Sequence, residues 1–155
     1  MNYISRIAEQ IPDGDVEEIK NAIGMDKRIS ESFLNAGLGF GGSCFPKDVK
    51  ALIAFSKELN INSDILQSVL TINDTQFMSV FEVLNKELGA LQGKKISILG
   101  LSFKPETDDI RDAISLKIIK KLLDKKAIVR VYDPIANDNV TVSYTHLTLP
   151  TILLV

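Results

Sequence analysis

The spacing of apolar positions changes near Gly93 and divides the chain into two parts. Before Gly93, apolar residues recur at steps of three and four, the spacing of amphipathic helices. After Gly93, short apolar runs flank a single stretch with helical spacing. The pattern therefore predicts a helical part over residues 1–92 and an α/β part that begins at residue 93.

Two helices are predicted early in the first part. One spans residues 15–23, where Asp15 is a suitable N-cap, acidic residues follow in the first turn and Gly24 ends the helix. The other begins at Pro46, a favourable first helical residue, and ends before Asn60.

A third helical stripe runs from residue 63 to residue 88. Asn73 and Asp74 are the positions at which we expect it to be interrupted. A stripe this long and apolar indicates protein core or a subunit interface more than a ligand groove.

The second part has the pattern of a βαβ unit. The run KKISILGLS after Gly93 predicts a short buried strand, residues 114–123 a helix, and residues 127–132 a second strand parallel to the first. Ligands of parallel sheets bind at the carboxyl ends of the strands. Residues 101–111 are therefore expected to form a ligand-facing loop.

Composition and charge narrow the class of protein. The chain has 155 residues, of which 45% are hydrophobic, so it has the material for a folded core. Its net charge of −2 argues against a nucleic-acid partner. No run approaches the roughly 18 apolar residues of a membrane span, and no leader sequence stands at the start. We expect neither nucleic acid nor membrane as a partner.

A single cysteine and a single histidine limit the chemistry further. One cysteine excludes an internal disulfide and a zinc site built from cysteines, and indicates a reducing compartment. We therefore expect no metal and a cytoplasmic location.

The most unusual segment is residues 37–44, which hold four glycines and Cys44. Glycines allow the backbone to approach a ligand closely and allow amide groups to converge on an anion. Cys44 precedes a predicted helix N-terminus, with Lys47 one turn away, and both favour the thiolate. Asp48 is placed to orient a hydrolytic water. A buried cysteine beneath a flexible glycine turn remains the alternative.

A second candidate segment spans residues 100–111. Gly100 follows a strand, but Ser102 and Pro105 break the G-x-G-x-x-G fingerprint of dinucleotide-binding loops. Lys104 and Arg111 could pair with phosphates. The alternative is a solvated, charged loop.

Both segments resemble signatures of one enzyme family. NAGLGFGGSCFPKDVKAL, residues 35–52, resembles the active-site signature of the UDP-glucose dehydrogenases in the UDP-glucose/GDP-mannose dehydrogenase family, and GLSFKPETDDIRDAIS, residues 100–115, resembles their second signature. The resemblance extends over residues 1–139. It implies an α/β chain, with a mostly helical central dimerisation domain over residues 1–92 and a partial Rossmann-like UDP-binding domain over residues 93–141.

The resemblance also implies an activity, the NAD-dependent oxidation of UDP-glucose to UDP-glucuronate by two hydride transfers. Cys44 matches the cysteine that adds to the aldehyde after the first transfer, and the second transfer leaves a thioester. Asp48 matches the residue that assists hydrolysis of this thioester.

Binding roles carry over in the same way. The positions that match substrate contacts are Arg28, Phe33, Leu34, Asn35, Ala36, Gly37, Gly41, Phe103 and Lys104, and those that match NAD contacts are Lys47 and Arg111. Arg28 is expected to reach the sugar bound by the other subunit of a homodimer.

Some family features have no match in this sequence. The family's cofactor domain and the upstream lysine and asparagine partners of the cysteine are absent, so we expect the chain alone to be inactive and at most to dimerise or hold a nucleotide sugar. Residues 142–155 do not resemble the family and are expected to be a non-native tail. A sibling enzyme acting on GDP-mannose or a UDP-N-acetylhexosamine is the alternative for the substrate.

Overall fold

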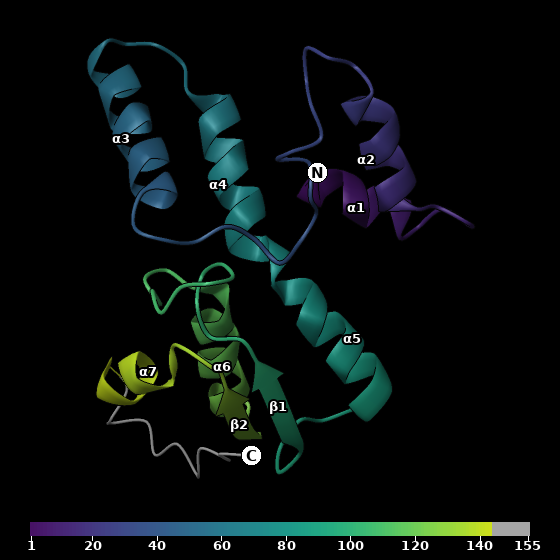
Figure 1. Ribbon diagram of the computed structural model, residues 1–155, viewed down its shortest axis with the longest axis vertical. Helices are drawn as coiled ribbons and strands as arrows, with labels where there is room; N and C mark the ends of the chain where they lie inside the picture. The colour runs from purple at the N-terminus through teal and green to yellow at the C-terminus, as the bar shows by residue number, and fades with distance from the viewer. Residues whose placement is uncertain (144–155) are drawn as a thin grey trace.

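The computed structural model describes residues 1–143, which form helices in the first part and a parallel βαβ unit in the second (Figure 1). The elements are α1 (Asn2–Ala8), α2 (Val16–Gly24), α3 (Phe45–Glu58), α4 (Asp64–Gln76), α5 (Met78–Leu88), β1 (Lys95–Leu99), α6 (Ile114–Asp124), β2 (Ile128–Tyr132) and α7 (Asn137–Ser143). α3 packs beside α4, and α5 continues from α4 to the sheet. The predicted α/β class and its helical first part are confirmed.

The predicted start signals of α2 and α3 act as expected. The Asp15 carboxylate accepts a 2.7 Å hydrogen bond from the backbone N–H of Glu17, which satisfies one free amide of the first turn of α2. Pro46 lies in the first turn of α3, where a missing N–H costs nothing.

The long apolar stripe breaks at a different place from the one predicted. α4 ends and α5 begins around Phe77, so the expectation of a break at Asn73 and Asp74 was wrong. Both residues are helical, and the side chains of both bond to other segments. Asn73 forms hydrogen bonds with Phe40 in residues 37–44, called here the glycine segment. Asp74 forms a 3.0 Å ion pair with Lys117 of α6.

β1 and β2 pair in parallel, from Lys95 beside Ile128 to Leu99 beside Tyr132, with α6 as the connection. The βαβ prediction is confirmed. The expectation of a buried first strand was wrong, because the residues of β1 alternate between exposed and half-buried. Within the described residues, one face of the sheet is covered and the other is exposed.

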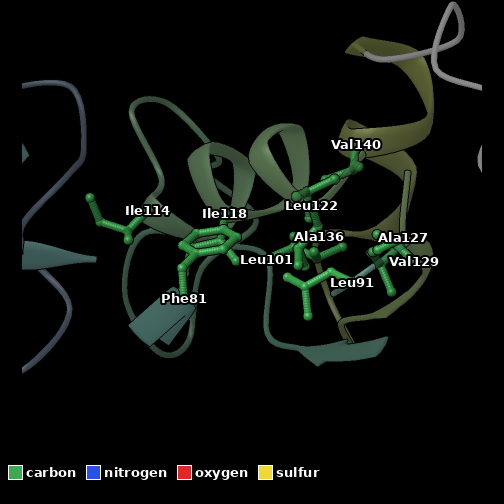
Figure 2. Packing of buried hydrophobic residues seen from close by; sticks show 12 residues of the cluster. Phe81, Leu91, Leu101, Ile114, Ile118, Leu122, Ala127, Val129, Ala136 and Val140 are labelled. Carbon is green, nitrogen blue, oxygen red and sulfur yellow. The ribbon is translucent and has the colours of Figure 1, made fainter. Parts of the chain in front are cut away.

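The hydrophobic core lies between the sheet, α5, α6 and α7. Its buried members are Phe81, Leu91, Leu101, Ile114, Ile118, Ile119, Leu122, Ala127, Val129, Val131, Ala136 and Val140, most of which are labelled in Figure 2. Burial of one large aliphatic or aromatic side chain stabilises a fold by about 1.5–3 kcal/mol. The second part, joined by α5, therefore supplies most of the stability of the described chain.

The helices before α5 bury few side chains. Those that are buried are Ser5, Ala8, Pro46, Asn73 and Gln76. Among residues 1–143, no helix is both long enough and apolar enough to cross a membrane.

Candidate active site

The predicted nucleophile is exposed at the start of a helix. Cys44 is the N-cap of α3, and its thiol is free and exposed, which contradicts the alternative of a buried cysteine. Asp48 lies one turn into α3, where its backbone N–H donates to the Cys44 carbonyl at 2.9 Å. Lys47 and Asp48 are also exposed, so all three side chains are open to solvent on the first turn of α3.

The glycine segment packs against the second candidate loop. The Gly42 N–H donates to the Arg111 carbonyl at 2.9 Å. A Cβ added at Gly41 would lie 2.2 Å from the Asp112 carbonyl oxygen, and one at Gly42 would lie 2.8 Å from the Phe103 ring. From the sequence, we expect the glycines of residues 37–44 to let the backbone approach a ligand closely. In the structure, the space that these two glycines leave is filled by the second loop.

Arg111 pairs with Asp109 within that loop. Its guanidinium makes bonds of 2.9 Å and 2.6 Å to the two carboxylate oxygens. These hydrogen bonds, and then one from the Arg111 N–H, lower the pKa of Asp109 to about 2. The same pairing raises the pKa of Arg111, and the charge of Cys44 adds a smaller upward contribution. The guanidinium of Arg111 is therefore held within the second loop by Asp109, while the Arg111 carbonyl bonds the glycine segment.

We expect the Asp109 carboxyl to titrate with a midpoint of about 2 when the chain is followed by NMR as a function of pH. Arg111→Ala should raise that midpoint toward the ordinary 3.8, because it removes the main stabiliser of the carboxylate. Lys104→Ala is the control and should change it little, since Lys104 is the weakest contributor. A midpoint near 3.8 in the unmodified chain would show that the ion pair does not form in solution.

Four of the predicted substrate residues line one pocket of about 580 Å³, called here the glycine-loop pocket. They are Phe33, Asn35, Ala36 and Gly37. The remaining lining residues are Met1, Asn2, Tyr3, Gly39, Phe40, Phe45, Val69, Ile72 and Asn73. Cys44 is not among them, although Phe45, the next residue, is. Leu34 and Gly41 also lie outside this pocket.

Phe103 and Lys104 line a different pocket, of about 530 Å³, at the carboxyl ends of β1 and β2. We call it the strand-end pocket. The Lys104 ammonium lies 5.5 Å from the centre of the Phe103 ring. A pocket at this edge agrees with the predicted ligand-facing loop. The structure therefore divides the predicted substrate residues between two pockets.

Asp133 organises the strand-end pocket and was missed at the sequence level. This buried carboxylate accepts hydrogen bonds from the backbone N–H groups of Leu101 (2.7 Å), Ser102 (3.3 Å), Ile135 (2.8 Å) and Ala136 (2.8 Å). Burial alone would raise the pKa of Asp133, but these donors together outweigh it and lower the pKa. The only local signal for this role was an aspartate directly after a strand.

Arg28 lies on an exposed segment outside both pockets. Its side chain is 87% exposed, and its guanidinium bonds Asp26 with an Nε to Oδ1 distance of 3.0 Å. Its expected role across a subunit interface stays a prediction. Over the described range 1–143, no group of three or more His, Cys, Asp or Glu side chains is arranged to hold a metal ion.

Two domains of one family match the chain. Residues 1–75 match the central domain of the UDP-glucose/GDP-mannose dehydrogenase family, and residues 97–152 match its UDP binding domain. The second match extends into the segment that we expected to be a tail, of which residues 144–155 lie outside the described structure. The assignment of residues 142–155 stays a prediction.

Individual relatives agree with this match. The chain is 46% identical, over 88% of its length, to the UDP-glucose 6-dehydrogenase YwqF of Bacillus subtilis, and covers 31% of that protein. A UDP-glucose dehydrogenase structure from Pyrobaculum islandicum is 40% identical, with a TM-score of 0.78 over 81% of this chain and 29% of that one. A GDP-mannose dehydrogenase structure from Pseudomonas aeruginosa is 28% identical, with a TM-score of 0.67 over 89% of this chain and 32% of that one.

Proposed function

The chain belongs to the UDP-glucose/GDP-mannose dehydrogenase family, and on that basis we propose that the protein it forms part of oxidises UDP-glucose to UDP-glucuronate. The chain spans about a third of the length of its relatives, so the activity is that of the larger protein. The observation that carries the proposal is the exposed Cys44 at the start of α3, with Arg111 of the second loop joined to the glycine segment before it by the 2.9 Å bond from the Gly42 N–H to the Arg111 carbonyl.

Cys44 is the nucleophile of the proposed reaction. Loss of a first hydride from C6 and of the hydroxyl proton converts the alcohol to an aldehyde. The thiolate sulfur of Cys44 adds to the aldehyde carbon, and loss of a second hydride from that carbon leaves a thioester. Water then attacks the thioester carbon, and the C–S bond breaks to release the carboxylate product and the thiol. Asp48, one turn from Cys44, accepts the proton of that water.

NAD, when bound, accepts the hydrides in this proposal. Lys47 and Arg111 are the residues of this chain that would contact it. Both are exposed cations, one on the first turn of α3 beside Cys44 and the other on the second loop, whose backbone bonds Gly42, and they suit the negative charge of a dinucleotide phosphate.

The proposal extends to the substrate, the assembly and the compartment. UDP-glucose is favoured over GDP-mannose because the relatives named for UDP-glucose share more sequence with this chain. A homodimer is supported by apolar side chains of α3 that are exposed in the single chain, Leu52 and Phe55 among them. The free, exposed Cys44 suits a reducing compartment, and we place the protein in the cytoplasm.

Two chimeras test the function and its substrate. In one, this chain replaces the matching segment of B. subtilis YwqF, and in the other it replaces that of the P. aeruginosa GDP-mannose dehydrogenase. We expect NADH formation from UDP-glucose in the first host and a loss of at least tenfold in kcat/KM for GDP-mannose in the second, because the chain supplies a UDP-binding domain.

Each unmodified host is the control, and size-exclusion chromatography and circular dichroism establish that each chimera is folded. A folded YwqF chimera that does not oxidise UDP-glucose, beside a fully active GDP-mannose chimera, would contradict the proposal and favour the sibling activity.

A further inference from the structure

α4 buries a side-chain amide that the proposed reaction does not yet use. Asn73 is 5% exposed, although most of α4 is exposed or half-buried. Burying an amide costs free energy unless hydrogen bonds compensate it. The partners of Asn73 therefore show why a polar residue occupies this position.

The Asn73 side chain forms two hydrogen bonds with one residue of the glycine segment, Phe40. Its Oδ1 accepts from the Phe40 N–H at 2.7 Å, and its Nδ2 donates to the Phe40 carbonyl at 3.0 Å. A Cβ added at Gly39 would lie 2.9 Å from the same Oδ1, so the segment approaches this amide as closely as a glycine allows. Both main-chain polar groups of Phe40 are thereby fixed by one side chain.

Phe40 in turn contacts Phe45, the residue that follows Cys44. The Phe40 ring packs edge-on against the Phe45 ring, with 4.7 Å between centroids. Phe45 is the first residue of α3 and follows Cys44 directly. Fixing Phe40 therefore fixes a neighbour of the cysteine as well as the segment that leads to it.

α4 also contacts α6 next to Asn73, through an exposed ion pair. Asp74, the next residue, pairs with Lys117 of α6 at 3.0 Å. From the other side, the Arg111 carbonyl accepts from the Gly42 N–H. The glycine segment is therefore held between two supports, α4 and the loop after β1.

We propose that Asn73 is a positioning residue that holds Cys44 in place through Phe40. The consequence for turnover rests on the proposed function. In catalysis, a misplacement of about 1 Å can cost on the order of 100-fold in rate. Asn73 lines the glycine-loop pocket and lies outside the strand-end pocket, but both polar atoms of its side chain bond Phe40, so it acts on the presentation of the thiol.

The chain itself allows a direct test because Cys44 is its only cysteine. In Asn73→Ala, the rate of Cys44 alkylation by iodoacetamide at fixed pH should fall at least threefold, since the sulfur loses its fixed place at the N-cap of α3. Amide hydrogen exchange at Phe40 should speed up at least tenfold. Alanine favours a helix more than asparagine, so α4 should remain helical. Asn73→Asp keeps the hydrogen-bond acceptor and loses the donor. Its alkylation and exchange rates should lie between those of the unmodified chain and those of Asn73→Ala.

Asn85→Ala is the matched control, because Asn85 is a helical asparagine exposed on α5. It should change neither readout. Unchanged alkylation in a folded Asn73→Ala chain would overturn the proposal, and so would faster exchange throughout α4 and α5, which would mean a general structural role.

The same substitution in the YwqF chimera should lower kcat on the order of 100-fold and leave KM for UDP-glucose within threefold. A rise in KM with unchanged kcat would also overturn the proposal. If the chimera without this substitution is inert, the proposed function fails, while alkylation and exchange on the chain still decide whether Asn73 positions Cys44.

Discussion

Replacing Cys44 with serine in the YwqF chimera is expected to lower the rate of UDP-glucuronate formation by at least about 10³-fold. A serine hydroxyl forms its anion far less readily than a thiol at neutral pH, so addition to the aldehyde is lost although the side chain is nearly the same size. The measurement is NADH formation with saturating UDP-glucose, together with quantification of the sugar acid.

Ser43→Ala is the matched control for this substitution. The Ser43 hydroxyl lies 3.6 Å from the Cys44 sulfur, so the variant perturbs the same turn without removing the thiol. It should retain activity within about threefold. A Cys44→Ser chimera that keeps more than a tenth of the activity would show that the cysteine is not the nucleophile.

Asp133→Ala should lower the free energy of unfolding of the chain by about 3 kcal/mol. The change leaves four backbone N–H groups without their carboxylate acceptor at a site where Asp133 is only 4% exposed. Urea unfolding at pH 7, monitored by circular dichroism, measures the loss.

The loss of unfolding free energy caused by Asp133→Ala should also depend on pH. Because the pKa of Asp133 is lowered in the fold, its stabilisation is fully present above the unfolded pKa of about 3.8 and disappears as the pH falls through the lower folded value. The difference between the two proteins should therefore shrink at strongly acidic pH.

Asp124→Ala, at the exposed end of α6, is the control and should cost less than about 0.5 kcal/mol. A loss below 1 kcal/mol for Asp133→Ala would mean that water can replace the carboxylate. Asp133 would then have no organising role in the strand-end pocket.

Local sequence signals were sufficient where a single segment determines its own structure. The Asp15 cap, Pro46 in the first turn of α3 and the βαβ pattern all depend on neighbours within one or two elements, and the structure agrees with each. The same holds for the position of Cys44 directly before a helix N-terminus.

Features that depend on distant segments were missed. Asn73 was interpreted as a helix breaker because asparagine has low helix propensity, but it lies within α4 and its side chain bonds Phe40, 33 residues away in sequence. The contacts of Gly41 and Gly42 with the second loop were missed for the same reason, because they also join segments that are far apart in the sequence. Spacing along the chain contains no information about which segment fills the space beside a glycine.

Two short helices at the ends of the described range were also missed. α1 and α7 have seven residues each, too few for an apolar period to be recognised. α7 follows a turn in which the Asp133 carboxylate bonds the N–H groups of Ile135 and Ala136. That turn depends on the contact of Asp133 with the loop after β1 and is not evident from residues 133–143 alone.

The stoichiometry of the YwqF chimera tests the central claim most directly. Oxidation of an alcohol to a carboxylate removes two hydrides, so two NADH should form for each UDP-glucose consumed, with UDP-glucuronate as the product. One NADH per sugar with release of the aldehyde, or no NADH from a folded chimera, would contradict the claim that Cys44 carries the substrate through a thioester.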